Sequence, residues 1–251
     1  NFAVFCATTA SAGTIGVGDY LKQLFPTSKI VASEALQCPT LLNNGFGAHR
    51  IEGIGDKHVP WIHNVKNTDL VTAIDDNSVV KIVRLFNEPE GKQYLAKKGV
   101  PENIIQNLYL FGHSGIANML TAIKFAKYYE LTEDDIVLAV LTDSIELYDS
   151  RIVEYRNQFG EYTSHDAAEG FASALMGEST DNMMELTYQD RKRVHNLKYY
   201  TWIEQQGRTY NEIMDQWYDK NYWTGFQSQI NEIDEYITEF NDRVGLLKKY
   251  N

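Results

Sequence analysis

The fold of this chain is decided at its start, by the stretch Phe2-Ala-Val-Phe-Cys-Ala-Thr-Thr-Ala-Ser-Ala-Gly-Thr-Ile-Gly-Val-Gly-Asp-Tyr-Leu-Lys22. Its apolar residues 2–7 predict a buried strand, and an amphipathic helix follows a turn of small residues at 8–14. Such a junction directs several backbone N–H groups and the positive end of a helix dipole at one point. The stretch therefore indicates a site for a phosphate group. The alternative is a tight strand-to-helix turn that binds nothing.

The glycine spacing of this turn excludes two common classes of phosphate ligand. Gly13-x-x-Gly16-x-Gly18 is not the GxGxxG of dinucleotide-binding folds, and the chain contains no GxxxxGK[ST]. We therefore expect a phosphate-bearing ligand that is neither a nicotinamide dinucleotide nor a nucleotide held by a P-loop.

The bulk composition restricts the class of protein. The chain has 251 residues, 43% of them hydrophobic, and a formal net charge of −11, which disfavours nucleic acid and anionic membranes as partners. No apolar run approaches the roughly 20 residues of a membrane span, and the first residues do not resemble a secretory signal. Two separate cysteines, Cys6 and Cys38, form neither a disulfide framework nor a zinc motif. We expect a cytoplasmic protein without a metal centre.

Strand and helix patterns alternate after the first helix. Residues 29–34 and 70–74 read as strands and residues 79–86 and 89–98 as helices. The unbroken apolar run at 136–141 is typical of a central parallel strand. The pattern predicts an α/β fold, a three-layer doubly wound and mostly parallel sheet with a C-terminal helical extension. We place the α/β domain at residues 1–150 and the aromatic-rich extension, a lid or dimer contact, at 151–251. Its last helix carries apolar residues on one face: Phe226, Ile230, Ile233, Ile237, Phe240, Val244 and Leu247.

Several small-residue turns would meet at one edge of this sheet, because ligands of open α/β sheets bind beyond the carboxyl ends of the strands. Besides residues 8–14 these are Gly112-His-Ser-Gly115, after the short apolar run 108–111 that we read as a strand, and Thr142-Asp-Ser144, with Gly53-Ile-Gly55 as a fourth candidate. They supply backbone donors and hydroxyls but few charges. Such a site holds a cofactor and leaves the chemistry to it.

This succession of motifs resembles the tryptophan synthase β-like superfamily of pyridoxal-phosphate enzymes (fold type II), and within it the cysteine synthases. Ala10-Ser-Ala-Gly-Thr14 stands where that family has a GTGGT-type phosphate loop, with alanines at two of its glycines. His49-Arg-Ile-Glu-Gly-Ile-Gly55 is similar to the family's H-K-I-x-G-I-G. Gly112-His-Ser-Gly-Ile-Ala117 is similar to G-I-S-S-G-A with one residue fewer, and Val140-Leu-Thr-Asp-Ser144 to L-P-D-S.

The resemblance implies that pyridoxal 5′-phosphate is the cofactor and assigns its contacts. The residues implied at the phosphate are Ala10, Ser11, Ala12, Gly13 and Thr14. Gly53 and Ile54 would flank the cofactor, and Ser114 would bond the pyridine nitrogen, with Asp143 as the competing candidate for that contact. A hydroxyl partner favours β-elimination and β-replacement over transamination. His113 is either a pocket base or a turn histidine bonded to backbone.

The family's Schiff-base lysine has no counterpart here, because it lies in the half of the enzyme that precedes the phosphate-loop strand. Lys57 reads as an ordinary loop residue. We therefore expect the C-terminal portion of a longer enzyme, or one piece of a split one, completed by a missing N-terminal half or a partner chain and forming a homodimer. No catalytic residue is assigned.

The expected reaction, on an amino-acid substrate, is replacement on an activated serine by sulfide or another nucleophile. The alternatives are a deaminating lyase, a threonine synthase- or diaminopropionate synthase-like enzyme, and a non-catalytic scaffold subunit.

Overall fold

The computed structural model describes residues 2–9, 13–55, 57–246 and 248, without the side chain of Thr14. It divides into two compact units, Asn1–Thr201 and Trp202–Asn251. This division differs from the boundary expected at residue 150. The reason is that side chains between 151 and 176, among them Tyr155, Tyr162 and Ala174, are buried in the same core cluster as the helices before them.

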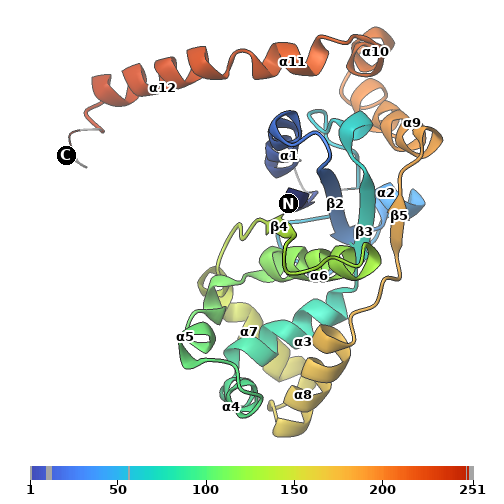
Figure 1. Ribbon diagram of the computed structural model, residues 1–251. Helices are drawn as coiled ribbons and strands as arrows, with labels where there is room; N and C mark the ends of the chain where they lie inside the picture. Colours follow the sequence, from blue (N-terminus) through green and yellow to red (C-terminus); the bar gives the residue numbers. More distant parts are fainter. Residues whose placement is uncertain (1, 10–12, 56, 247, 249–251) are drawn as a thin grey trace. The chain divides into compact units, whose positions relative to one another are not determined.

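The first unit is built on a five-stranded sheet with the order β4-β1-β2-β3-β5 (Figure 1). The four parallel strands are β1 (Phe2–Thr8), β2 (Lys29–Ala35), β3 (Leu70–Ile74) and β4 (Ile136–Ala139). The short β5 (Met183–Glu185) is antiparallel to β3. The sheet is mostly parallel, as the alternating pattern predicts.

Helices cover both faces of the sheet, because successive side chains of a strand point to opposite sides. Phe5 of β1 packs in one cluster with Ile15 of α1 (Gly13–Leu24). Val4 and Cys6 of the same strand pack on the other side with Phe125 of α6 (His113–Tyr128). The predicted three-layer α/β architecture is confirmed.

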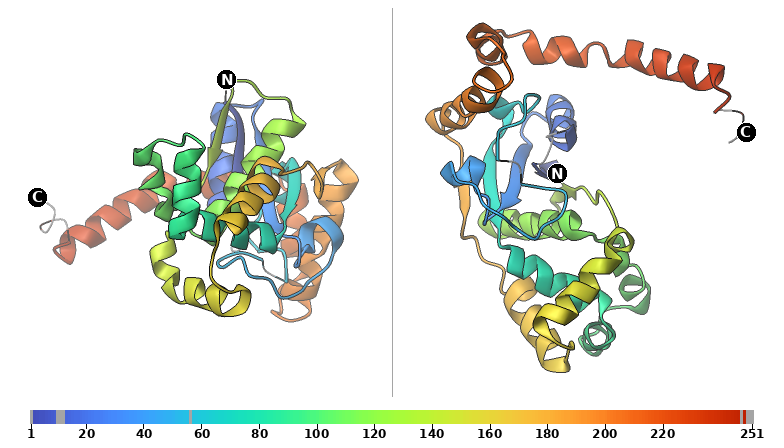
Figure 2. Two further views of the ribbon diagram at one scale, coloured as in Figure 1. Left: turned by 90° about the horizontal axis from the view of Figure 1, so that it is seen from below. Right: turned by 180° about the vertical axis from the view of Figure 1, so that it is seen from behind.

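The remaining helices of the first unit lie mostly beyond α6. α3 packs on α6, which separates it from the sheet (Figures 1 and 2). The bounds of the α-helices are α2 Thr40–Asn43, α3 Asp76–Asn87, α4 Pro89–Lys97, α5 Glu102–Ile105, α7 Asp149–Phe159, α8 Ser164–Glu169 and α9 Tyr188–Asn196. π-helical turns follow α8 at Gly170–Met176 and α9 at Tyr199–Ile203.

One glycine of the opening stretch has a packing role. A Cβ on Gly18 would lie 2.9 Å from Cδ1 of Phe5 and 3.0 Å from Cγ1 of Ile30, whereas a Cβ on Gly16 would meet nothing within 4 Å. Gly18 therefore lets α1 approach the sheet closely. This accounts for one of the glycines without any ligand.

Two expectations about strands are wrong. The run 136–141 does not form a central strand: β4 pairs with β1 alone among the described residues, and Ile136 is 58% exposed. An apolar run predicts that its side chains are buried, but it does not predict the position of the strand in the sheet. The run 108–111 contains a 3₁₀ turn, Leu108–Leu110, instead of a strand.

The second unit consists of α10 (Tyr210–Tyr218), α11 (Tyr222–Gln227) and α12 (Ile230–Arg243). Thr209 and Glu212 cap α10 reciprocally. Trp223 Nε1 donates to the carbonyl of Gln216 at 3.0 Å, which ties α11 to α10. The last predicted helix, 226–247, is thus divided at residues 228–229, and Leu247 lies outside the described residues. Over the part of the chain that the structure describes, no helix has the length and apolar character to cross a bilayer.

Candidate functional site

The strand order reverses between β1 and β4, which is where open α/β sheets bind ligands. β1 leads through α1 to β2 and then β3, while β4 lies on the opposite side of β1. The turns after β1 and β4 therefore flank a topological switch point. The predicted phosphate loop and the Thr142-Asp-Ser144 turn are these two connections.

The start of α6 joins the turn after β4. The backbone N–H of Gly112 donates to the carbonyl of Asp143 at 3.0 Å. A Cβ on Gly112 would lie 2.2 Å from Oδ1 of Asp143, so only glycine permits this approach. This bond, and not a preceding strand, brings the Gly112 turn to the carboxyl edge of the sheet.

Ser114, in the first turn of α6, is held by the loop after β4. Its side chain is buried, its Oγ bonds Oγ1 of Thr142, and it donates to Oδ1 of Asp143 at 3.4 Å. The Tyr148 hydroxyl donates to the other oxygen of Asp143. Burial, and after it this hydrogen bond, raises the pKa of Tyr148 to about 12. Ser114 and Asp143 are therefore partners in one hydrogen-bonded chain.

His113 precedes Ser114 and is fully buried. Its Nε2 lies 2.7 Å from the hydroxyl of Tyr155, and its Nδ1 has no hydrogen-bond partner among the described residues. Burial lowers the pKa of His113 to about 4, so the imidazole is neutral at physiological pH. His113 is bonded to a side chain of α7 and not, as one alternative has it, to backbone.

The turn after β1 is anchored at its start. The N–H and the hydroxyl of Thr9 both donate to the carbonyl of Ser33, at 2.8 and 3.0 Å. Gly13 opens α1 four residues later. Ala10, Ser11 and Ala12 lie outside the described residues, as does the side chain of Thr14, so their phosphate contacts stay a prediction.

The predicted cofactor-flanking loop has the backbone of a glycine turn. Gly53 and Gly55 have φ of +80° and +82°, which favours glycine at both. Ile54 between them is buried in the hydrophobic core. Any contact that Ile54 makes with a cofactor therefore comes from its backbone. Arg50 fastens the loop, its N–H donating to Asp76 Oδ2 at 3.0 Å.

A buried carboxylate at the end of β2 has no place in the sequence-based site. Glu34 accepts hydrogen bonds from the backbone N–H groups of Leu41, at 2.9 Å, and Leu42, at 2.8 Å. Burial raises its pKa to about 7. The carboxylate fixes the start of the long connection that carries the Gly53 loop. In the sequence, the only sign of this role was that a glutamate, Glu34, stands within an otherwise apolar strand pattern.

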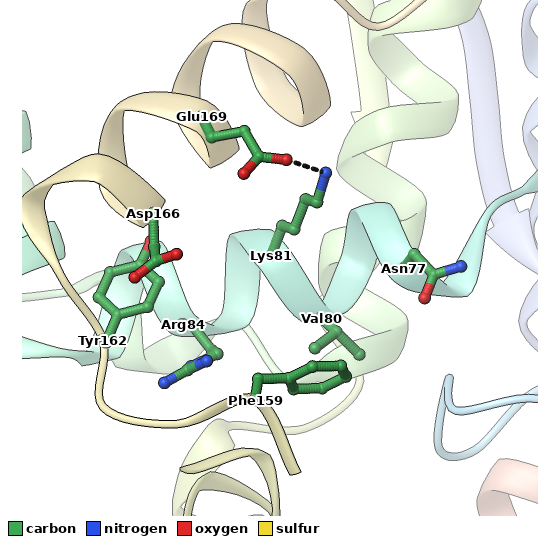
Figure 3. A pocket seen from close by; sticks show the side chains of 8 residues that line it. All are labelled: Asn77, Val80, Lys81, Arg84, Phe159, Tyr162, Asp166 and Glu169. Carbon is green, nitrogen blue, oxygen red and sulfur yellow. Dashed lines mark hydrogen bonds and ion pairs between the residues drawn. The ribbon is translucent and has the colours of Figure 1, made fainter.

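Two cavities lie near this edge and along α3. One of about 230 Å³ is next to Tyr155, and its wall includes the ion pair of Arg151 with Glu52. The other, of about 260 Å³, lies between α3 and the segment 159–169 (Figure 3). Both cations that line it are engaged: Lys81 bonds Glu169 at 2.7 Å, and Arg84 donates to the carbonyl of Gly160 at 2.8 Å and forms an ion pair with Glu88. We therefore assign no ligand to the second cavity.

Comparison with known proteins identifies relatives for just over half of the chain. Cysteine synthase B of Campylobacter jejuni is 30% identical over 146 residues, which cover 58% of this chain and 42% of that protein. Cystathionine beta-synthase of Saccharomyces cerevisiae is 29% identical over 161 residues, or 61% of this chain and 28% of that protein. The chain is cysteine synthase-like. No family profile matches it.

The cysteine synthase-like fold is also found among solved structures. Cysteine synthase from Entamoeba histolytica superposes with a TM-score of 0.50 at 20% identity, covering 68% of this chain and 45% of that one. At this identity the likeness concerns the fold alone. The chain spans less than half the length of the curated relatives it matches.

The cysteine synthase-like chain brings only part of the predicted site together. Ser114 and Asp143 are in contact, and both lie at the switch point. The described residues hold no group of three or more His, Cys, Asp or Glu side chains that could bind a metal ion. Tyr148 and Tyr155, which hold Asp143 and His113, escaped the sequence analysis, because isolated tyrosines carry no motif.

Proposed function

We propose that this chain forms the pyridoxal-phosphate cradle of an enzyme that carries out elimination and replacement at the β-carbon of an amino acid. The observation that carries the proposal is Ser114. Its buried hydroxyl is held by Thr142 and Asp143 at the switch point. The identity to cysteine synthase B supports the class of reaction.

The residues present fit this cofactor. α1 begins at the turn after β1, and α6 begins at the Gly112 turn, which is bonded to the turn after β4; helix N-termini favour a phosphate dianion. The groups at the pyridine side are hydroxyls and one carboxylate that is already engaged. We assign the phosphate to residues 10–14 and the flank of the ring to Gly53 and to the backbone of Ile54.

Which group donates a hydrogen bond to Ser114 determines whether Ser114 can itself donate one to the ring nitrogen. The Ser114 hydroxyl has one proton. When Thr142 donates to Ser114 Oγ, that proton can leave its 3.4 Å contact with Asp143 Oδ1 and bond a neutral pyridine nitrogen. Asp143 accepts from Tyr148 and orients Ser114, and does not supply a charge to the ring. The bound cofactor supplies the electron sink for the substrate carbanion. A neutral pyridine nitrogen withdraws electrons less strongly than a protonated one, which favours elimination and replacement over transamination.

His113 and Lys57 have supporting places. His113 is buried, neutral and bonded to Tyr155, so we give it no proton exchange with a substrate. Nζ of Lys57 lies 5.6 Å from the ring centre of Phe46, a cation–π contact that suits a loop lysine. We propose that the lysine that bonds the cofactor comes from a partner chain or a segment outside this sequence. We also propose that the complete enzyme is a homodimer and is located in the cytoplasm.

The test is a cofactor measurement on the protein isolated from its own cells, with whatever chain accompanies it. A visible absorption band that borohydride removes is expected, and Ser114→Ala should weaken cofactor affinity about tenfold, since one hydrogen bond of about 1.4 kcal/mol is lost. Ser144→Ala is the matched control, because the hydroxyl of Ser144, the last residue of the same turn, donates to Glu146 at 3.2 Å. A protein without the band, or a Ser114→Ala variant with unchanged affinity, would overturn the proposal. Absence of the band would favour the scaffold subunit.

A further inference from the structure

The cavity of about 230 Å³ next to Tyr155 lies between the loop that leads to Gly53 and the helix α7. The loop contributes three side chains to its wall, those of His49, Arg50 and Glu52. The residues of α7 that line it, at positions 151, 154, 155 and 158, share one face of the helix, because they are three, one and three residues apart. Gly53, Ile54 and Ser114, which we assign to the cofactor, are not part of this wall.

The wall of this cavity is polar, which disfavours an apolar ligand. It carries no aliphatic side chain among the described residues, and the hydroxyl of Tyr155 is already bonded to His113. Nδ1 of His49 accepts a hydrogen bond from the N–H of Ile51 at 3.3 Å, so this nitrogen carries no proton and the ring adds no charge. Pockets for drug-sized ligands have volumes of about 300–1,000 Å³, so this cavity suits a smaller molecule.

One side of the cavity has an excess of negative charge. The guanidinium of Arg151 pairs with Glu52 through one terminal nitrogen and with Glu154 through the other, at 2.5 Å. One positive charge therefore faces two carboxylates. The side chain of Glu154 is 53% exposed, and Oε2 is its one oxygen that is bonded within the described part of the chain. Its other oxygen is thus available to a ligand that donates a hydrogen bond.

Arg50 supplies the opposite charge. Among the described residues its guanidinium contacts uncharged groups: it lies 5.4 Å from the ring centre of Phe159 and donates to Oδ1 of Asn77 at 3.4 Å. A guanidinium can form two parallel hydrogen bonds to one carboxylate, and neither of these neighbours satisfies that capacity. Arg50 is therefore suited to bind a carboxylate of a ligand.

The separation of the two charges suits one small molecule that carries both signs. Phe159, which contacts Arg50, comes five residues after Glu154 on α7, and this is about 7.5 Å along the helix axis. In an α-amino acid the nitrogen lies about 2.5 Å from the carboxyl carbon. With a charge-assisted hydrogen bond of about 2.8 Å at each end, the zwitterion spans about 8 Å. A simple anion would face the excess carboxylate and a simple cation would face Arg50, so the wall favours a zwitterion over either.

We infer that this cavity is a binding site for a small α-amino acid, with the ligand carboxylate on Arg50 and the ligand ammonium group on Glu154. The site adjoins the proposed cofactor site without being part of it, because Glu52 directly precedes Gly53 in the sequence. Binding of the amino acid here does not require the proposed function to be correct.

Isothermal titration calorimetry with L-alanine tests the inference on the protein isolated from its own cells. Borohydride treatment beforehand prevents L-alanine from reacting with a bound cofactor. We expect saturable binding of L-alanine, and binding at least about tenfold weaker for acetate and for ethylamine, which each carry one of the two charges. Acetate that binds as tightly as L-alanine would indicate a site for anions alone and would overturn the inference. The absence of saturable L-alanine binding would overturn it as well.

Variants of the two charged residues test the assigned contacts. Arg50→Gln and Glu154→Gln should each weaken L-alanine binding at least about tenfold, because each removes one charge-assisted hydrogen bond. Arg50→Lys keeps the charge and should lose less affinity than Arg50→Gln. The matched controls are Arg243→Gln and Glu239→Gln, which change an ion pair on α12 and should leave the affinity unchanged. Wild-type affinity in Arg50→Gln, or equal losses in the controls, would contradict the assignment.

Ser114→Ala separates this site from the cofactor site, and it should leave the affinity for L-alanine unchanged. Loss of L-alanine binding in Ser114→Ala, together with unchanged binding in Arg50→Gln, would place the amino acid at the cofactor site. That result would overturn this inference and leave the proposed function standing. Absence of the visible absorption band would instead overturn the proposed function, and the calorimetric result expected for Arg50→Gln would be the same.

Discussion

The hydroxyl of Tyr155 supports the start of α6, and its removal gives a sharp test of this site. Nε2 of His113 has Tyr155 as its partner at 2.7 Å, while Nδ1 already lacks one among the described residues. Tyr155→Phe keeps the ring and removes one oxygen atom. The imidazole is then buried with neither nitrogen bonded.

The cost follows from this geometry. A buried polar group that loses its partner costs about 1–3 kcal/mol. Tyr155 is itself only 4% exposed, so losing its hydroxyl spares a desolvation cost and offsets part of that penalty. We expect the free energy of unfolding to fall by about 1–2 kcal/mol. Urea denaturation at pH 8, where His113 is neutral, measures it.

Tyr128→Phe is the control, since Tyr128 is 48% exposed and substitutions at such positions stay within about 0.5 kcal/mol. A loss below about 0.5 kcal/mol in Tyr155→Phe would refute the idea that Tyr155 satisfies a buried histidine.

The same histidine predicts a pH dependence. Burial lowers the pKa of His113 to about 4 from its ordinary 6.5. The unfolded chain therefore takes up a proton at a higher pH than the folded one, so the stability is complete above pH 6.5 and is lost as the pH falls toward 4. This difference in pKa between the unfolded and the folded chain corresponds to about 3 kcal/mol. His113→Phe should flatten the stability curve in that window, and an unchanged slope would contradict the assignment.

Two further predictions concern α1 and Glu34. Gly18→Ala should lower the free energy of unfolding by about 1–3 kcal/mol, because its Cβ would meet Phe5. Gly16→Ala, whose Cβ would meet open space, should raise it by up to about 1 kcal/mol. Equal changes in melting temperature for the two variants would refute the packing role of Gly18. Burial raises the pKa of Glu34 to about 7 from 4.5, so the folded state binds this proton more tightly. As the pH rises from 4.5 to 7, the wild type should lose about 3 kcal/mol of unfolding free energy relative to Glu34→Gln, measured by urea denaturation. Parallel plots of unfolding free energy against pH for the two proteins would contradict this.

The sequence predicts the fold where the signal is local. β2 and β3 and the helices α3 and α4 lie within about three residues of their expected positions, because apolar period, capping residues and prolines act over one or two turns. The position of β4 in the sheet depends instead on which other strands are present. Its apolar run is compatible with a centre or an edge, and only the pairing with β1 distinguishes them.

The same distinction applies to the site. The small-residue turns are recognisable because they follow strands, and the topology gathers them at one edge. The groups that hold them are separated along the chain: Tyr155 comes 42 residues after His113, and Leu41 seven after Glu34. A tyrosine in an amphipathic helix carries no local mark of such a contact. Supporting residues of this kind become visible only after folding.

The contact of Ser114 with Asp143 changes how the two are compared as ligands of the ring. As isolated residues they are alternatives, a hydroxyl for a neutral nitrogen and a carboxylate for a charged one. In the fold Tyr148 holds one oxygen of Asp143 and Ser114 contacts the other. Turning the carboxylate toward the ring would break the Tyr148 bond, whereas turning the Ser114 proton toward the ring breaks only its 3.4 Å contact with Asp143. Hydrogen bonds to a charged group are worth about 1.5–3 kcal/mol each. Losing the Tyr148 bond costs more than losing the long contact from Ser114, and we therefore expect Ser114 to face the cofactor while Thr142 donates to its oxygen.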